Sequence, residues 1–319
     1  MTPAALEWIG RFRRYLLAER RFSSHTDSNY ARDLAALVAY CDREALERWS
    51  VLTTHNVRHF AARLHAGGLA PKSIQRRLSA LRSFYNFLIL ESLPRRGAGG
   101  KLEYCTDADI AKIKSNPGYE VRAPKAARLL PKTLDADQMA RLLEIPPGDA
   151  FVTRDKAMME TLYSSGLRLS ELVGLDLDSV DSKDHTVRVI GKGRKERIVP
   201  VGRKALEAIG LWLQQRGASA KPAESALFTG RNGTRLGARA VQLRVAHWAR
   251  RQGLNVSVHP HLFRHSFASH ILESSGELRG VQEMLGHASL TTTQIYTHLD
   301  FQHLSRIYEA SHPRARKKA

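Results

Sequence analysis

Side chains able to handle a phosphodiester gather towards the end of the chain, within HPHLFRHSF, LGH and TTTQIYTH. The candidates are His261, Arg264, His287 and Tyr296, together with Arg168 and Lys192 upstream. Such a set could grip a phosphate with its cations, attack it with the phenol and protonate the departing oxygen. The residue types alone therefore indicate cleavage by a side chain of the protein.

The alternative route, a water activated by a metal ion, usually needs clustered carboxylates. The chain has no obvious acidic cluster and no His-Glu-x-x-His. His261 and His265 have the i,i+4 spacing of metal ligands, but the residues between them supply no carboxylate. GKGRKE at 191–196 also lacks the spacing of a nucleotide-binding loop. We expect no metal ion and no cofactor.

Arginine suits the side-chain route because its planar fork donates two parallel hydrogen bonds to phosphate oxygens. His261 and Arg264 stand three residues apart, so they would share one face of a helix. This pair alone is also typical of an ordinary helix surface. A phenol with a pKa of about 10 needs cations or a base nearby to react at neutral pH.

The net charge favours nucleic acid as the partner. Lys and Arg total 50 against 31 Asp and Glu, which gives +19 and a pI near 10.3. This is the electrostatic footprint of a nucleic-acid binder. A solvated basic surface or a ribosome-associated protein would also explain the charge.

The cysteines and the first residues indicate a soluble cytoplasmic protein. Cys41 and Cys105 lie far apart without metal-ligand spacing, which fits a reducing compartment. Charges interrupt the apolar positions of MTPAALEWIGRFRRYLL, so we expect neither a signal peptide nor a membrane span there.

Helical periodicity predicts a first domain over residues 1–92, with helices at 4–18, 26–41, 54–66 and 71–92. Arg76, Arg77 and Arg82 on the fourth helix could follow DNA phosphates or face solvent. Residues 93–130 are rich in Pro, Gly and basic side chains and are expected to be a linker. Its middle, LEYCTDADIAKIK, is less linker-like and has no explanation in the sequence.

Residues 131–312 are expected to form a mostly helical second domain with one small antiparallel sheet, followed by a basic tail at 313–319. The strand pattern lies at 185–190 and 197–201, joined by GKGRKE. Predicted helices lie at 151–164, 203–215, 238–251, 260–274 and 279–285, with a helix start at 134–137 and a helical turn from 167. The fold class is mainly α, with a mixed α/β second domain.

Five motifs in order resemble the tyrosine recombinase (phage integrase) family: SSGLRLSEL, GKGRKER, HPHLFRHSF, LGH and TTTQIYTH. The resemblance covers nearly the whole chain and is closest to the Xer subfamily. The closing run THLDFQHLSRIYEASHPRARKK is most similar to its XerC branch. The longer segment between the domains departs from the usual pattern of the subfamily.

The resemblance implies a role for each residue in a transesterification like that of type IB topoisomerases. Tyr296 would attack the scissile phosphate and become a 3′-phosphotyrosine, while Arg168 and Arg264 would clamp the non-bridging oxygens. Lys192 would protonate the 5′-oxygen, although Arg194, Lys195 and Arg197 stand close by. His261 would accept a proton or bind the phosphate, and His287 would hydrogen-bond the phosphate. No ATP would be needed, because the ester keeps much of the energy of the broken bond.

Other residues near these motifs are expected to be structural. Glu171 would brace the region of Arg168, and packing or hydrogen bonding would account for His265, His270, His298 and His303.

The implied partners are double-stranded DNA, a sister Xer-type recombinase in a heterotetramer, and a cell-division DNA translocase. Chromosome dimers would be resolved at cell division, and residues 300–312 would dock on a neighbouring subunit. Two alternatives remain open at this point: a mobile-element integrase of the same chemistry, or a non-catalytic DNA-binding protein.

Overall fold

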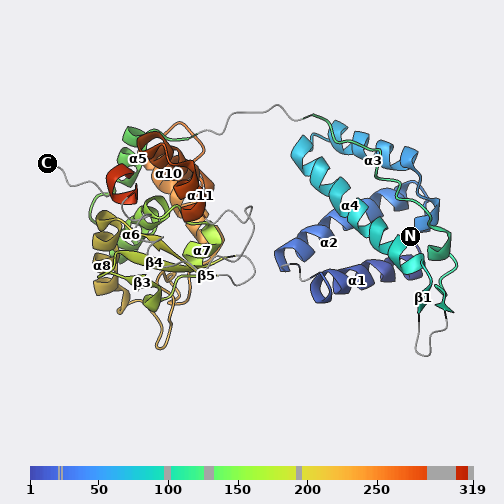
Figure 1. Ribbon diagram of the computed structural model, residues 1–319, viewed down its shortest axis with the longest axis horizontal. Helices are drawn as coiled ribbons and strands as arrows, with labels where there is room; N and C mark the ends of the chain where they lie inside the picture. The colour runs from blue at the N-terminus through green and yellow to red at the C-terminus, as the bar shows by residue number, and fades with distance from the viewer. Residues whose placement is uncertain are drawn as a thin grey trace. The chain divides into compact units, whose positions relative to one another are not determined.

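The computed structural model describes residues 1–20, 22, 24–96, 102–125, 133–191, 196–285 and 307–314. The chain divides into two compact units, Met1–Leu129 and Leu130–Ala319, each with its own hydrophobic core (Figure 1). Lys192, His287 and Tyr296 lie outside the described residues, as do His298 and His303.

The described residues of the first unit form four α-helices, which confirms the predicted helical domain. These are α1 (Pro3–Ala18), α2 (Ser24–Arg43), α3 (Thr54–Ala66) and α4 (Pro71–Ser92), with short 3₁₀ turns η1 (Trp49–Val51) and η2 (Ile110–Lys112) and strands β1 (Arg95–Arg96) and β2 (Leu102–Glu103). Local signals set the helix starts: Thr53 caps α3 in a reciprocal capping box with Asn56, and Pro71 opens α4.

Aromatic side chains fill the centre of this unit. Phe12 of α1 meets Phe84 of α4 edge to face at 5.4 Å between ring centroids. Trp49 is fully buried against Phe84, and its indole N–H donates to the carbonyl of Ala5 at 2.7 Å. Large buried rings of this kind carry much of the apolar area that holds a small helical domain together.

Part of the expected linker packs on the first unit. Ile110, Ile113 and Val121 are buried in its core, in chain that has no helical periodicity. Arg82 donates to the carbonyls of Gly118, at 2.8 Å, and of Val121. Its guanidinium therefore holds this segment against α4.

The other two arginines considered for phosphate contact also have partners within the unit. Arg76 and Arg77 both face the buried carboxylate of Asp33, at 2.6 and 3.7 Å. These ion pairs fasten α4 to α2.

In its described residues the second unit is mostly helical with one three-stranded antiparallel sheet, which confirms the predicted fold class. Its helices are α5 (Ala136–Leu143), α6 (Ala150–Ser164), α7 (Leu169–Val173), α8 (Arg203–Arg216), α9 (Ala238–Arg251), α10 (Pro260–Ser275) and α11 (Leu278–Leu285), with a turn of helix at 307–311. Its strands are β3 (Val180–Asp181), β4 (Thr186–Ile190) and β5 (Glu196–Pro200), in the order β3-β4-β5, with η3 (Leu177–Ser179) before them.

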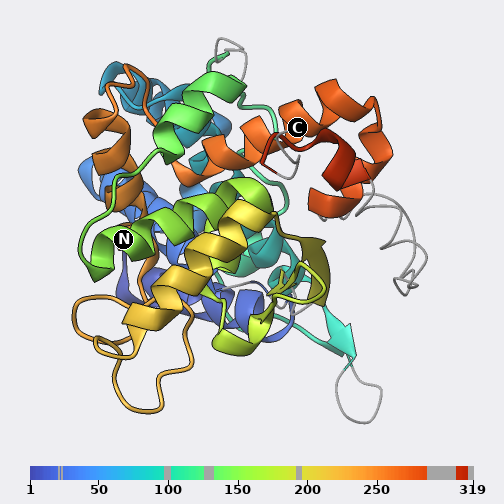
Figure 2. The ribbon, with the colours of Figure 1, turned by 90° about the vertical axis from the view of Figure 1, so that its left-hand side faces the viewer.

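Helix α6 runs through the middle of this unit and packs alongside α8, as Figure 2 shows in green and gold. Its Asp155 is fully buried and accepts hydrogen bonds from Arg154 at 2.7 Å and from the Trp248 indole at 3.0 Å. Arg244 of α9 completes the cluster. Buried charge is tolerated here because every partner is a donor.

The β4–β5 hairpin pairs Val189 with Arg197 and Ile190 with Glu196, next to residues 192–195. Val187, Val189 and Val199 face the core. The predicted strand pair is confirmed, and β3 adds a short edge strand that the sequence did not indicate. Every helix among the described residues falls short of the length or apolar character that crossing a membrane requires.

Candidate active site

The turn between α6 and α7 brings the first candidate arginine beside α10. Gly166 adopts φ +58°, in the left-handed region that favours glycine. A Cβ built on it would lie 2.5 Å from the ring of Phe267 on α10. The absent side chain thus permits close approach, and Arg168 follows two residues later as the N-cap of α7.

Arg264 is fixed from two sides. Its Nη1 donates to the carbonyl of Gly166 at 2.8 Å, and its Nη2 donates to the carbonyl of Leu285 at the end of α11. Arg264 is only 8% exposed. Burial, followed by the charge of Arg168, lowers the pKa of Arg264 to about 10, so it remains charged at neutral pH.

Arg168 is held by Glu171, one turn into α7. The Glu171 carboxylate accepts from the Arg168 backbone N–H and from its Nη1, both at 2.8 Å. On its other side the carboxylate accepts from Arg197 of β5 at 2.7 and 3.0 Å. Burial raises the pKa of Glu171, but the hydrogen bonds and charge of Arg197 and Arg168 outweigh it and lower the pKa overall.

His261 stands in the first turn of α10, three residues before Arg264. Its ring is exposed, and partial desolvation lowers its pKa, with further contributions from His259, His265, Arg264 and Arg168. A pKa below 6.5 leaves the imidazole mainly neutral at pH 7, able to accept a proton. His261 and Arg264 lie one turn apart on α10, and Arg264 reaches the carbonyl of Gly166, two residues before Arg168.

The structure thus brings together the candidates among its described residues, Arg168, His261 and Arg264. Leu285, whose carbonyl accepts from Arg264, is the last described residue before the segment 286–306, which carries His287 and Tyr296. Lys192 belongs to the residues between β4 and β5, and its position is likewise not described.

Arg197 pairs with Glu171 at this site, and the sequence analysis gave it no role of its own. It alternates with Ile198 and shares the buried side of β5 with Val199. A charged residue at an inward position of a strand needs a buried counter-ion. The sequence does not mark position 197 as inward, because the exposed Ile198 is as apolar as the buried Val199.

The structure describes two other histidines of α10, His265 and His270. His270 is buried, and its Nδ1 hydrogen-bonds the hydroxyl of Tyr163 at 2.7 Å. His265 is exposed on α10. Among the described residues, no group of three or more His, Cys, Asp and Glu side chains is placed to share a metal ion.

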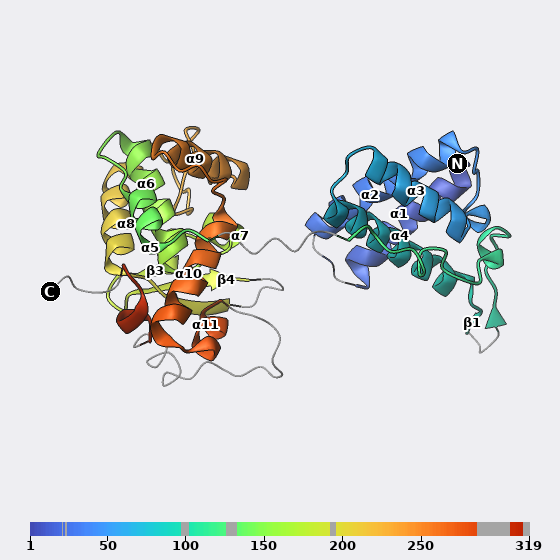
Figure 3. The same cartoon turned by 90° about the horizontal axis from the view of Figure 1, so that it is seen from above.

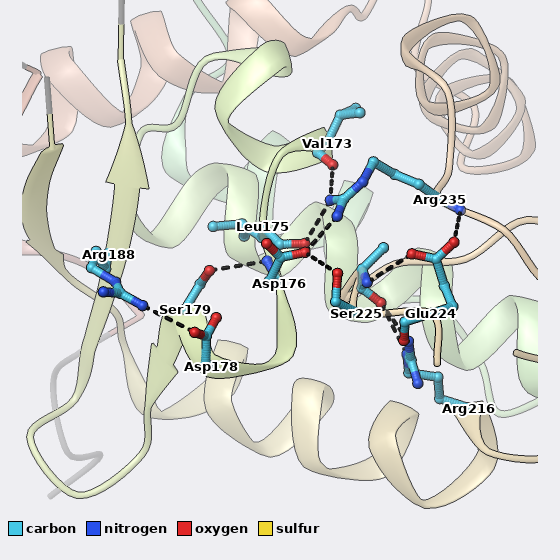
Figure 4. Close-up of polar contacts among 11 residues, drawn as sticks. Val173, Leu175, Asp176, Asp178, Ser179, Arg188, Arg216, Glu224, Ser225 and Arg235 are labelled. Atoms are coloured by element: carbon cyan, nitrogen blue, oxygen red, sulfur yellow. Dashed lines mark hydrogen bonds and ion pairs between the residues drawn. The ribbon is translucent and has the colours of Figure 1, made fainter. Parts of the chain in front are cut away.

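A second polar network lies at the C-terminal end of α7 (Figure 4). Arg235 donates to the carbonyls of Val173 at 2.9 Å and Leu175 at 3.0 Å, and it pairs with Asp176. Figure 4 also shows Ser225 reaching Asp176, at 3.0 Å. The end of α7 is thereby anchored to the loop between α8 and α9, which fixes the helix that presents Glu171.

The segment 307–314 packs on its own unit, beside α6 and α10 (Figure 1, red). Tyr308 shares a hydrogen bond of 2.6 Å with Ser164 at the end of α6. His312 is buried against Tyr163, Tyr308 and Phe267. These contacts of residues 307–314 lie within one chain, and the docking of 300–312 on a neighbouring subunit stays a prediction.

Two family models match the chain. Residues 132–303 match the phage integrase family, and residues 9–92 match the N-terminal SAM-like domain of phage integrases.

Curated relatives match over almost the full length. A tyrosine recombinase XerC of Salmonella typhi is 49% identical over 318 residues, covering 99% of each chain. A tyrosine recombinase XerC of Azotobacter vinelandii is 50% identical over 311 residues, covering 97% of each.

Solved structures share the fold. The site-specific recombinase XerH bound to its difH substrate, in a pre-cleavage complex, gives a TM-score of 0.69 at 19% identity, covering 96% of this chain and 93% of that one. A lambda integrase dimer bound to a core site gives 0.65 at 18% identity, covering 93% and 100%.

Proposed function

Because this chain belongs to the phage integrase family and is a DNA strand-transferring tyrosine recombinase, we propose that it cuts and rejoins DNA through a 3′-phosphotyrosine formed on Tyr296. The phenol oxygen attacks the scissile phosphorus, and the bond to the 5′-oxygen breaks. A 5′-hydroxyl from another strand then attacks the phosphotyrosine and releases Tyr296. Each step exchanges one phosphodiester for another, so no external energy source is required.

The observation that carries this proposal is the anchoring of Arg264. Backbone carbonyls of Gly166 and Leu285 fix its guanidinium, and Gly166 lies two residues before Arg168. Preorganised cations stabilise the charge that grows on the non-bridging oxygens. Two arginines held in one place suit a phosphate better than two flexible surface side chains would.

The proton transfers are assigned to His261 and Lys192. Neutral His261 accepts the phenol proton of Tyr296, and Lys192 gives a proton to the departing 5′-oxygen. His287 hydrogen-bonds the phosphate. In this scheme both cations and proton carriers come from the protein, and no step needs a metal ion.

The cellular role we propose is the resolution of chromosome dimers at cell division. A sister recombinase would complete a heterotetramer on double-stranded DNA, and a cell-division DNA translocase would activate it. The near full-length similarity to XerC proteins supports this role, and the substrate-bound XerH complex together with the net charge of +19 supports a DNA partner. Residues 1–92 would form a DNA-binding domain, and 93–130 would link it to the catalytic domain. Residues 131–312 would form that catalytic domain, which cleaves the DNA, and 313–319 would form a basic tail.

The two cysteines, Cys41 and Cys105, are both free, which supports a cytoplasmic location.

A nicked suicide DNA substrate tests the chemistry. Wild-type protein should form a covalent adduct in the presence of EDTA, and Tyr296→Phe should form none. Tyr104→Phe is the matched control, since Tyr104 is 69% exposed on the first unit. An adduct that survives the Tyr296 change would refute the nucleophile, and strict dependence on Mg²⁺ would refute the mechanism.

Mixing the protein with a sister recombinase from the same genome tests the partnership. Footprinting should show cooperative occupation of two adjacent half-sites only when both proteins are present. Full recombination by this protein alone at a mobile-element end would instead favour an integrase role.

A further inference from the structure

The buried carboxylate of Glu171 links Arg168 of the candidate site to Arg197 of β5. Both Glu171 oxygens accept from Arg197, and both also accept from Arg168, through its backbone N–H and its Nη1. The Glu171 side chain is 1% exposed, that of Arg197 is 8% exposed, and that of Arg168 is 37% exposed. Arg168 is thus the arginine of this trio that reaches the surface.

Arg197 is the stronger partner of the carboxylate. Its guanidinium makes a two-pronged contact with Glu171, the geometry in which arginine binds a carboxylate best. Among the groups that lower the pKa of Glu171, Arg197 contributes most and Arg168 less. A carboxylate shared in this way holds Arg168 less tightly than one for which Arg168 is the sole counter-ion.

Arg197 also lies at the foot of the hairpin that carries Lys192. It pairs with Val189 across the sheet and stands two residues after the segment 192–195. Figure 3 shows β4 next to α7. The hydrogen bonds from Arg197 to Glu171 join β5 of the same sheet to the helix that begins after Arg168. The foot of the hairpin and Arg168 are therefore fixed to the same carboxylate.

We propose that Arg197 is a positioning residue for strand cleavage, acting through Glu171. It limits the hold of Glu171 on Arg168 and sets the foot of the β4–β5 hairpin relative to Arg168. The inference rests on the proposed function, in which Arg168 binds the scissile phosphate and Lys192 reaches the leaving oxygen.

Arg197→Met removes the charge while keeping an apolar stem of similar length. Glu171 then binds the Arg168 guanidinium, which it already contacts at 2.8 Å, more strongly. We expect single-turnover cleavage of the nicked substrate to fall by about 10- to 100-fold, as when a group that orients a metal ligand is removed. DNA affinity should stay unchanged. Arg188→Met is the matched control, because Arg188 is an exposed arginine of the same hairpin that pairs with Asp178 (Figure 4).

A neutral substrate separates positioning from general damage to the fold. In a methylphosphonate, a methyl group replaces one non-bridging oxygen, so the scissile phosphorus no longer presents a negative charge to Arg168. The deficit of Arg197→Met relative to wild type should shrink on this substrate. Equal deficits on the phosphate and the methylphosphonate would overturn the inference.

A second substitution tests the route through the carboxylate. Glu171→Gln removes the charge that Arg197 neutralises, so the double variant Arg197→Met/Glu171→Gln should cleave faster than Arg197→Met alone. A double variant that is no faster would contradict a role through Glu171. If Arg197→Met does not fold, Arg197→Lys keeps the charge but not the fork, and it should show a smaller, phosphate-selective loss; wild-type cleavage by the folded Lys variant would argue against the inference.

Arg168→Met distinguishes failure of this inference from failure of the proposed function. Wild-type cleavage by Arg168→Met would remove Arg168 from the phosphate site. A dead Arg168→Met beside a fully active Arg197→Met would leave the proposed function intact and overturn only the role of Arg197.

Discussion

The hydroxyl of Tyr308 lies 2.6 Å from the hydroxyl of Ser164, two residues before Gly166. The backbone N–H of Gly202 donates to the same Ser164 oxygen, also at 2.6 Å. Ser165 donates to the carbonyl of Pro200 at 2.9 Å. The segment 307–314, the end of β5 and the turn that leads to the candidate site therefore meet at one point.

Tyr308→Phe removes the hydroxyl from this junction without changing the ring. We expect the free energy of unfolding to fall by about 1 kcal/mol, the usual net value of a buried hydrogen bond. Urea denaturation measures it, and Tyr104→Phe on the exposed surface should cause no change. An unchanged midpoint for Tyr308→Phe would mean that this hydrogen bond adds nothing to stability.

His312 should make the stability of the protein depend on pH. Burial lowers its pKa to about 3, with smaller contributions from His270 and Arg314, whereas the unfolded chain has a value near 6.5. Between these values only the unfolded state binds the proton, so stability is lost as the pH falls below about 6.5, by at most about 1.4 kcal/mol per pH unit.

Comparison with His312→Phe isolates this effect. Burial raises the pKa of nearby Glu160, which acts in the opposite direction, but Glu160 is present in both proteins. The unfolding free energy of wild type should drop more than that of the variant between pH 7.5 and pH 5. Parallel pH profiles would show that His312 does not titrate as inferred.

Gly166→Ala should damage both stability and cleavage. A left-handed φ and the 2.5 Å approach to Phe267 leave no room for a methyl group, so we expect a loss of about 1–3 kcal/mol. The backbone carbonyl of residue 166, which accepts from Arg264, should also shift, so adduct formation should slow.

Gly210→Ala is the matched control for Gly166. Gly210 lies within α8, and a Cβ there would meet nothing within 4 Å. Alanine should stabilise the protein by up to about 1 kcal/mol, because it favours the helix. A neutral Gly166→Ala would contradict the close-approach argument.

Arg264→Lys keeps a positive charge but removes the fork that reaches both carbonyls. We expect the protein to fold and to bind DNA, and its single-turnover cleavage to fall by about 100- to 1000-fold, as for other lost oxyanion donors. Quench-flow measurement of adduct formation tests this. Near wild-type cleavage would show that charge alone suffices at this position.

The helices could be predicted from the sequence because their signals are local. Predicted segments 54–66 and 238–251 coincide with α3, which begins at a capping box, and with α9, whose apolar residues recur at helical spacing. Strand β3 has two residues, too few for an alternation pattern. The packing of Ile110 and Val121 on the first unit was missed because irregular chain carries no periodic signal.

The candidate site, like the fold, could be predicted only in part. The residue types and the spacing of His261 and Arg264 could be predicted, whereas the anchoring of Arg264 and the double pairing of Glu171 depend on tertiary contacts. The roles of the catalytic residues and the domain boundaries stay predictions.

The contact between Arg264 and Gly166 joins positions 98 residues apart in the chain. Helices form from neighbouring residues and can appear early in folding, whereas such a distant contact must wait for a large loop to close. A partly folded chain would already carry the positive charge that attracts DNA, but it would lack the paired arginines. We therefore expect the ability to break a DNA strand to be gained last, when the chain is otherwise complete.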